Sequence, residues 1–334
     1  MPKKDTVILP ADTKREWILK LEGETDERYG RMPWDRTIQA HLNNGVVNID
    51  KPRGPTSHTV VDWVKHIVHA KKTGHSGTLD PGVTGSLPTC MDNATKVVQA
   101  LLPAGKEYVC MMRLHKEAPE AKIRAACESF IGVISQKPPL KSAVVRVVRQ
   151  RQIYYLDVLE VDGKDVLFRV GCEAGTYIRT LCVQIGVSLG MRANMNELRR
   201  TRTGPFDEST LVKLHELKDA YDFWKEEGEE KYLRHFVQPV EAAVKHLPKL
   251  VIHDSAVDYI CNGSPIMVPG ILKIETGIKP KDLVAAFTLK GELVALGRAL
   301  MPTEEIVDKK KGIAIKTDRV LMDLGTYPRP PKKI

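Results

Sequence analysis

A glycine-rich stretch between Lys71 and Leu87 surrounds a single carboxylate, Asp80. The stretch reads KKTGHSGTLDPGVTGSL, with four glycines, one histidine and a proline directly after the aspartate. Glycines let a backbone come close to a ligand, which an ordinary turn does not require. The residue types therefore raise the question of whether Asp80 does chemistry.

Three other chemistries do not fit this stretch. A phosphate-binding loop needs a lysine directly after its second glycine, and neither Gly82 nor Gly85 is followed by one. A G-x-S-x-G nucleophile elbow around Ser76 is broken, because Gly77 follows the serine directly. His75 has no second ligand at zinc-like spacing. The window alone favours a structural Asp–Pro turn, with a functional carboxylate as the alternative.

The flanking sequence predicts the elements that position this loop. Residues 45–51 have the pattern of a strand that ends at a Pro- and Gly-rich turn. Residues 58–72 carry valines and isoleucine at helical spacing, with Ser57 as the expected N-cap, and the glycine-rich stretch then follows as a loop. Further along we expect a short helix, a strand, a helix closed by Gly132, a hairpin and a second helix, at residues 93–102, 106–115, 120–132, 151–175 and 176–190.

These elements alternate without a βαβ cadence, so the sequence predicts an α+β domain with a mixed sheet. After residues 247–250 the sequence pattern changes to short β-rich segments separated by turns. This pattern indicates a small β-barrel of about eighty residues. We therefore divide the chain into an N-terminal arm (1–40) that packs on the C-terminal domain, a main domain (41–246) and a C-terminal domain (247–330).

Composition places the chain among ordinary globular proteins. It has 334 residues, of which 42% are apolar and 28% charged. No apolar run is long enough to span a membrane, and the first residues lack the apolar core of a secretory signal, so an intracellular protein is expected. The six cysteines form no C-x-x-C pair, which favours buried free thiols over a zinc site or disulfides.

The net charge of +9 favours nucleic acid only weakly, and two basic clusters matter more. Residues 141–151 contain four cations and no acid, and residues 198–202 contain three cations in five positions. Such clusters can follow a phosphate backbone, but a solvated face is an equally good interpretation.

Five segments resemble motifs of the TruB family of RNA pseudouridine synthases. The glycine-rich stretch resembles the family's catalytic loop, and the strand at 106–115 resembles the one that carries its active-site tyrosine. The other matches are GVVNIDKPRGPTS (first motif), AGTYIRTL (Tyr-x-Arg motif) and LRRTRTGPF (Leu-Arg-Arg segment). They occur in family order between Gly45 and Phe206, so chance explains them poorly.

The C-terminal segments GSPIMVPGI and LVALGRALM resemble a PUA domain, an RNA-binding β-barrel. Together with QKPPLKSAV and the arm, they are similar to the dyskerin type, the guide-RNA branch of the family. The family commonly has the sequence Ser-Ala-Val-Lys in this segment. Here Val144 is followed by Val145 and then Arg146, so the lysine is absent. Only a short stretch separates Leu114 from Gln136, so the extra RNA-gripping loop of stand-alone bacterial members has no counterpart.

The resemblance implies isomerisation of uridine to pseudouridine, without a cofactor or metal. Asp80 is then the essential carboxylate, attacking the base at C6 or the sugar at C1′, two routes that the sequence leaves open. Tyr108 is expected to stack on the flipped base and assist proton movement, and Arg179 to hold Asp80 ionised. Further substrate contacts are assigned to His75, Tyr177 and Leu198, with core packing as the alternative for Tyr177 and an ordinary hydrogen-bonded role for His75. Lys51 and Pro52 are expected to shape the pocket floor.

The implied partners are an H/ACA guide RNA, a substrate RNA (rRNA, and in a second reading tRNA), and small proteins that include a kink-turn binder. RNA contacts are expected at Lys141, Arg146, Arg149, Lys273 and Arg298. No membrane is implied, and the expected location is the cytoplasm, or the nucleolus in a eukaryote. The alternatives are a guide-independent tRNA synthase, a non-catalytic RNA scaffold and, less favoured, a hydrolase using Ser76.

Overall fold

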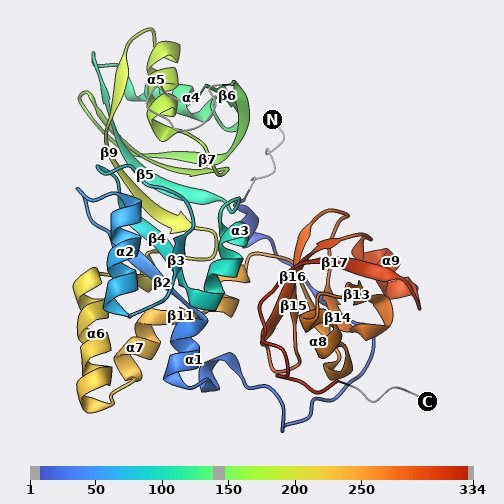
Figure 1. Ribbon diagram of the computed structural model, residues 1–334. Coiled ribbons are helices and arrows are strands. Elements are labelled where there is room, and N and C mark those ends of the chain that lie inside the picture. Colours follow the sequence, from blue (N-terminus) through green and yellow to red (C-terminus); the bar gives the residue numbers. More distant parts are fainter. Residues whose placement is uncertain (1–7, 138–146, 330–334) are drawn as a thin grey trace.

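The computed structural model describes residues 8–137 and 147–329, which form two bodies side by side (Figure 1). The larger body is built on a mixed ten-stranded sheet, with β10-β2-β4-β9-β5-β8-β7-β6 as its main order; β11 pairs with β2, and β3 with β4. The strands are β2 Gly45–Lys51, β3 Thr73–His75, β4 Thr84–Met91, β5 Lys106–Leu114, β6 Gly132–Gln136, β7 Arg149–Asp162, β8 Asp165–Cys172, β9 Ala193–Thr203, β10 Leu211–Val212 and β11 Val237–Pro239.

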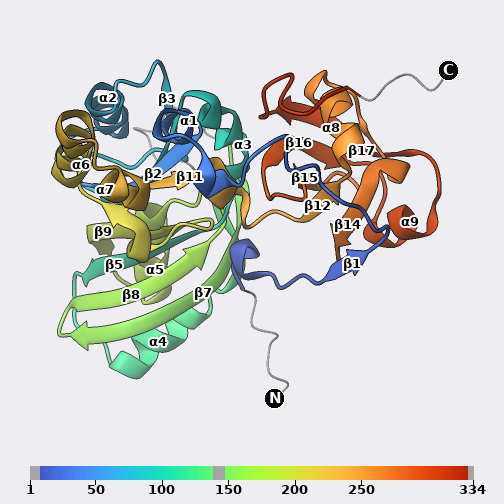
Figure 2. The ribbon, with the colours of Figure 1, turned by 90° about the horizontal axis from the view of Figure 1, so that it is seen from below.

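Helices pack against the two halves of this sheet (Figures 1 and 2). Around β2, the apolar faces of α1, α2, α6 and α7 share one core, and α4 and α5 share a second core with β5, β7 and β8. The helices are α1 Ile38–Asn43, α2 Ser57–Ile67, α3 Val98–Leu101, α4 Glu120–Glu128, α5 Ile178–Ser188, α6 Leu214–Glu227 and α7 Lys231–Phe236. Short 3-10 turns add η1 Pro10–Asp12, η2 Pro33–Asp35, η3 Asp92–Val97, η4 Glu208–Thr210 and η5 Val240–Val244.

The two halves of the sheet meet at β4 and β9. These strands run parallel and pair only at Thr84 with Arg199 and Gly85 with Arg200. On its other side β9 pairs along its whole length with β5. The start of β4, directly after the glycine-rich loop, therefore lies beside the Leu-Arg-Arg segment of β9.

The smaller body is a seven-stranded sheet in the order β1-β14-β12-β15-β16-β17-β13. Its first strand comes from the N-terminal arm: Ile18 lies opposite Ile274 and packs into the core of this body. The elements are β1 Trp17–Leu19, β12 Lys249–Ile252, α8 Asp254–Cys261, β13 Ile266–Met267, η6 Val268–Gly270, β14 Ile271–Glu275, β15 Leu283–Phe287, β16 Leu293–Ala299, α9 Thr303–Asp308 and β17 Ile313–Val320.

The predicted α+β class with a mixed sheet and a C-terminal β-body is confirmed, but three local expectations were wrong. Thr56, not Ser57, caps α2 by accepting from the Thr59 amide at 3.1 Å, because the Ser57 hydroxyl is occupied by Leu79. The glycine-rich stretch is not all loop, since β3 and β4 include its two ends and leave 76–83 between them. The helix at 120–132 ends at Glu128, and Gly132 begins β6 with φ +117°.

No helix in the described ranges is long and apolar enough to cross a membrane.

Replacing Gly85 by alanine tests the β4–β9 contact. Gly85 has φ +101°, and a Cβ there would lie 2.2 Å from the Arg200 carbonyl oxygen. We expect Gly85→Ala to lower the free energy of unfolding by about 2–4 kcal/mol, measured by urea denaturation. Gly82→Ala is the matched control, because its Cβ meets nothing within 4 Å, and it should change stability by less than about 1 kcal/mol. Equal effects would contradict the close approach of the two strands.

Candidate active site

The loop that carries Asp80 is anchored on both sides of the aspartate. On one side, the buried Ser57 hydroxyl donates to the Leu79 carbonyl at 3.0 Å and accepts from the Leu79 amide at 2.8 Å. On the other side, the Gly54 amide donates to the Pro81 carbonyl at 2.9 Å. The Val83 amide donates to the Asp80 carbonyl at 3.0 Å and so forms a turn. These hydrogen bonds therefore hold the backbone on both sides of Asp80 in one conformation.

Lys51 lies beneath this loop and is fully buried. Its ammonium donates to the carbonyls of Pro52, Pro81 and Val83 at 2.9, 3.2 and 2.9 Å. Burial lowers the pKa of Lys51, and the nearby negative charge of Asp80 partly opposes this. Lys51 thus holds the far side of the loop from within the protein, in keeping with the structural role expected of it.

Arg200 joins the two ends of the loop from β9. Its side chain is 1% exposed; Nε donates to the Ser86 carbonyl at 2.7 Å and Nη2 to the Gly77 carbonyl at 3.0 Å. Burial lowers the pKa of Arg200, and its interaction with the Tyr108 hydroxyl opposes that shift. In the sheet Arg200 lies directly opposite Tyr108. Sequence reasoning missed this residue; the second arginine of LRRTR was its only signal.

The other cations of that cluster are also bound within the protein. Arg199 pairs with Asp50 at 2.9 Å and with Glu208 at 2.7 Å, and Arg202 pairs with Asp12. The three arginines at 198–202 therefore make contacts within the protein and do not form a run of unpaired cations.

The carboxylate itself points outward and meets Arg179. Asp80 and Arg179 have side chains that are 58% and 49% exposed, and Arg179 Nη2 donates to Asp80 Oδ2. Arg179 lies in the first turn of α5, two residues after Tyr177. A guanidinium in this position fixes the direction of the carboxylate. The pair is open to solvent, so a substrate can reach it.

The two tyrosines come from different elements. Tyr108 is partly exposed on β5; burial around its hydroxyl is the main cause that raises its pKa, and the negative charge of Asp80 adds to the effect. Tyr177 precedes α5 as its N-cap residue. The buried Gln136 holds its backbone, accepting from the Tyr177 amide at 2.9 Å and donating to its carbonyl at 3.1 Å. Gln136 is a second residue that sequence reasoning missed.

The remaining predicted substrate contacts flank this group. His75 Nδ1 accepts from the Gly77 amide at 3.2 Å, and its ring packs edge-on against His58. Burial is the main cause that lowers the pKa of His75 to about 4, so the imidazole is neutral at pH 7. Leu198 is partly buried on β9, opposite Cys110.

The predicted RNA contacts are dispersed. Lys141 and Arg146 lie outside the described residues. Arg149 is partly exposed at the start of β7, and Lys273 is exposed on β14. Arg298 is held by Asp318 at 3.3 Å and by the Lys281 carbonyl at 3.2 Å. The structure does not bring the three described cations together.

Ser76 cannot serve a hydrolase in this arrangement. Its side chain is fully buried, and its Oγ has no hydrogen-bond partner among the described residues. A serine nucleophile needs access to substrate and a base within reach. Within the same ranges, no three His, Cys, Asp or Glu side chains gather closely enough to hold a metal ion.

Comparison with known proteins accounts for nearly the whole chain. Four family descriptions match in succession: the DKCLD (NUC011) domain at 7–61, the TruB family pseudouridylate synthase N-terminal domain at 65–178, the tRNA pseudouridylate synthase B C-terminal domain at 179–245 and the PUA domain at 248–321. "Probable tRNA pseudouridine synthase B" of Methanopyrus kandleri is 57% identical, covering 96% of this chain and 95% of the relative. The protein of the same name from Pyrococcus abyssi is 56% identical, covering 96% and 97%.

Solved structures agree with these relatives. A chain of a Cbf5-Nop10-Gar1 complex is 55% identical, with a TM-score of 0.95 over 98% of this chain and 100% of that chain. A chain of an H/ACA RNP bound to a substrate RNA containing 2′-deoxyuridine is 53% identical, with a TM-score of 0.91 over 96% and 99%. This chain therefore belongs to the TruB family of RNA pseudouridine synthases and carries a C-terminal PUA domain.

Proposed function

We propose that this chain isomerises specific uridines in RNA, chiefly rRNA, as the catalytic subunit of an H/ACA guide ribonucleoprotein, with Asp80 as the essential carboxylate. The observation that carries the site assignment is the exposed Asp80 on a doubly anchored loop, in contact with Arg179. Membership in the guide-RNA branch is supported by the likeness to chains solved in a Cbf5-Nop10-Gar1 complex and in an RNA-bound H/ACA RNP.

The reaction breaks the N1–C1′ bond of uridine, turns the base and joins C5 to C1′. The proton lost from C5 is balanced by one gained at N1, so no redox partner is needed. A paired uridine cannot be reached, and the base must leave the helix to meet Asp80. Asp80 attacks either C6 of the base or C1′ of the sugar.

The side chains around Asp80 orient it and bind the flipped base. Arg179 orients the Asp80 carboxylate through their hydrogen bond. Tyr108 has a raised pKa, so its phenol is neutral at pH 7 and can form one wall for the base while assisting proton movement at C5. Tyr177 forms the other wall, and Leu198 and the neutral His75 border the nucleotide.

The proposed partners are an H/ACA guide RNA, the substrate RNA and small proteins, including counterparts of Nop10 and Gar1 and a kink-turn binder. Contacts with RNA are proposed at Lys141, Arg146, Arg149, Lys273 and Arg298, and the proposed location is the cytoplasm. The arm (1–40), catalytic domain (41–246) and PUA domain (247–330) remain our proposed division of the chain.

A guide-independent tRNA pseudouridine synthase is the second candidate, favoured by the names of the relatives from Methanopyrus kandleri and Pyrococcus abyssi. Incubating the purified chain with unmodified tRNA, without guide RNA or partner proteins, separates the two. Formation of pseudouridine at the rate of the guided reaction would make the tRNA activity primary.

Asp80→Asn should abolish isomerisation. In the assembled guide complex we expect uridine conversion to fall by roughly 10³-fold or more, since the amide cannot act as a nucleophile. RNA binding, measured by filter retention, should not change. Asp157→Asn is the matched control, because Asp157 is a similarly exposed carboxylate paired with Arg169 at 2.9 Å. Normal conversion by Asp80→Asn would remove the assignment of Asp80 as the essential carboxylate.

Arg179→Gln should slow conversion without weakening RNA binding. The substitution removes the charge that orients Asp80, and we expect a single-turnover rate lower by roughly 10²-fold. Arg169→Gln removes a similarly exposed ion pair, between Arg169 on β8 and Asp157 on β7, and should leave the rate close to that of the unaltered protein. A loss of RNA affinity that explains the whole defect of Arg179→Gln would contradict the proposed role.

A further inference from the structure

The first turn of α5 carries Arg179, and the position of this turn decides whether Arg179 reaches Asp80. Ile178, Leu181 and Ile185 pack α5 into the core that it shares with α4, β5, β7 and β8. Apolar packing is not directional, so it does not by itself fix where the helix starts. Hydrogen bonds are directional, and a group of them holds the start of α5.

Gln136 makes these hydrogen bonds with its whole side-chain amide. It ends β6, which lies at the same end of the catalytic body as α5 (Figure 1), and it is 2% exposed. Its Oε1 accepts from the Tyr177 amide at 2.9 Å, and its Nε2 donates to the Tyr177 carbonyl at 3.1 Å. Nε2 also donates to Gln184 Oε1 at 3.2 Å. Both N–H groups and the oxygen of the amide are therefore used.

The backbone of Tyr177 sets the direction of every bond in this group. Its N–H can only donate and its carbonyl can only accept, so the Gln136 amide fits in one orientation. Gln136 then donates to the Gln184 oxygen, which leaves Gln184 Nε2 to donate to the Ser135 carbonyl at 2.9 Å. Tyr177 and Gln184 lie about two helical turns apart, so both are on the side of α5 that meets β6. We call these hydrogen bonds among Ser135, Gln136, Tyr177 and Gln184 the glutamine network.

The glutamine network connects the sheet to the start of the helix. On the sheet side, β6 pairs with β7 along its whole length. On the helix side, the Tyr177 carbonyl also accepts from the Leu181 amide at 3.0 Å, within the first turn of α5. A shift of Tyr177 would therefore carry this turn, and Arg179 within it, away from Asp80.

We propose that Gln136 is a positioning residue for the reaction: by holding Tyr177 it places the first turn of α5, and with it Arg179, against the Asp80 carboxylate. This inference rests on the function proposed for Asp80 and adds to it. Neither Gln136 nor Gln184 needs to touch the substrate in this role. Breaking the glutamine network should therefore slow the chemical step and leave the affinity for RNA unchanged.

Gln136→Glu tests the proposal through its pH dependence. An ionised carboxylate can only accept, so it would repel the Tyr177 carbonyl and the Gln184 oxygen, whereas a protonated carboxyl has one donor and restores the bond to Tyr177. In the assembled guide complex, the single-turnover rate of the variant relative to the unaltered protein should fall as the pH rises from about 5 to about 9. At about pH 9 it should be about 10- to 100-fold lower. The affinity for substrate RNA, measured by filter retention, should not change.

The ratio of the two rates isolates the new carboxyl group. Other groups that titrate are the same in both proteins, so their effects cancel. On the elements around Gln136 the charged residues include the following side chains: Arg149 and Arg151 on β7, Glu173 paired with Arg151, and Arg179 paired with Asp80.

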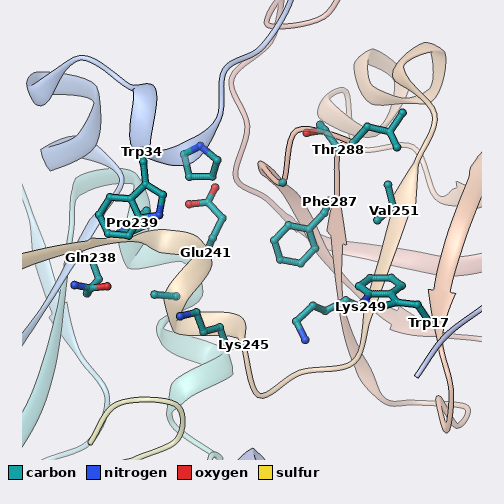
Figure 3. A pocket seen from close by; sticks show the side chains of 14 residues that line it. Trp17, Trp34, Gln238, Pro239, Glu241, Lys245, Lys249, Val251, Phe287 and Thr288 are labelled. Carbon is teal, nitrogen blue, oxygen red and sulfur yellow. The ribbon is translucent and has the colours of Figure 1, made fainter. Parts of the chain in front are cut away.

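Gln238→Glu is the matched control. Gln238 lines the cavity between the catalytic body and the PUA domain (Figure 3), and its Nε2 donates to the His235 carbonyl at 3.2 Å. It pairs with Val46 at the start of β2, whereas Lys51, beneath the catalytic loop, is at the other end of that strand. The rate of this variant relative to the unaltered protein should not change with pH.

Gln184→Ala provides a second test if Gln136→Glu does not fold. Gln184 is half-buried and alanine favours the helix, so α5 should form. Removing this partner of Gln136 should slow conversion by about 3- to 10-fold at unchanged RNA affinity. Circular dichroism and urea denaturation show that the variant is folded, and an unaltered rate would then overturn the proposal.

A double variant shows whether Gln136 acts through Arg179. At about pH 9, Gln136→Glu combined with Arg179→Gln should be close in rate to Arg179→Gln alone, because the guanidinium to be positioned is already absent. Two defects that multiply would mean independent roles and would overturn the proposal. A rate ratio of Gln136→Glu that is constant with pH, or a defect explained wholly by lost RNA affinity or by unfolding, would overturn it as well.

These outcomes are distinct from a failure of the proposed function. If the unaltered protein converts uridine and Asp80→Asn does not, any of them removes only the role of Gln136. Conversion by Asp80→Asn would instead contradict the function proposed for Asp80.

Discussion

The active site depends on two buried cations that donate to backbone carbonyls in the 76–83 loop and directly beside it. Lys51 holds Pro52, Pro81 and Val83, and Arg200 holds Gly77 and Ser86. A buried charge is costly unless its hydrogen bonds are satisfied, so these side chains are stable only while the loop keeps its course. The same bonds make the loop rigid, since moving a carbonyl would leave a buried donor without its partner.

This arrangement explains why Asp80 can be exposed and still be precisely placed. Its side chain reaches solvent, while the residues on both sides are fixed by Ser57, Gly54 and Lys51. Because the loop is already ordered, little free energy is needed to position the carboxylate when a nucleotide arrives. Arg179, from a different element, then aligns an aspartate whose backbone does not move.

Sequence reasoning recovered the parts of this site that follow local patterns. The strands at 45–51 and 106–114, the hairpin ending at Cys172 and the helix before Gly190 were all predicted at nearly their observed positions. Asp80 and Arg179 were paired only through family resemblance, since 99 residues separate them. Their contact depends on how α5 packs against the sheet, which no local pattern contains.

The supporting residues were missed for a physical reason. Lysine and arginine are rarely buried, so a basic cluster such as LRRTR first indicates a surface. That Arg200 points inward follows from the parallel pairing of β4 with β9, which joins segments more than a hundred residues apart. The helix cap was misplaced for a related reason, because a tertiary contact to Leu79 takes the hydroxyl of Ser57. Such long-range partners become visible only in the folded chain.

The most direct test is a crystal structure of this chain in its guide complex with a substrate RNA bound. The account predicts that the target uracil lies between Tyr108 and Tyr177, with the Asp80 carboxylate against C6 or C1′. It also predicts that the hydrogen bonds from Lys51 and Arg200 to the 76–83 region stay in place. A uracil bound away from Asp80, or a loop rearranged with those hydrogen bonds broken, would contradict it.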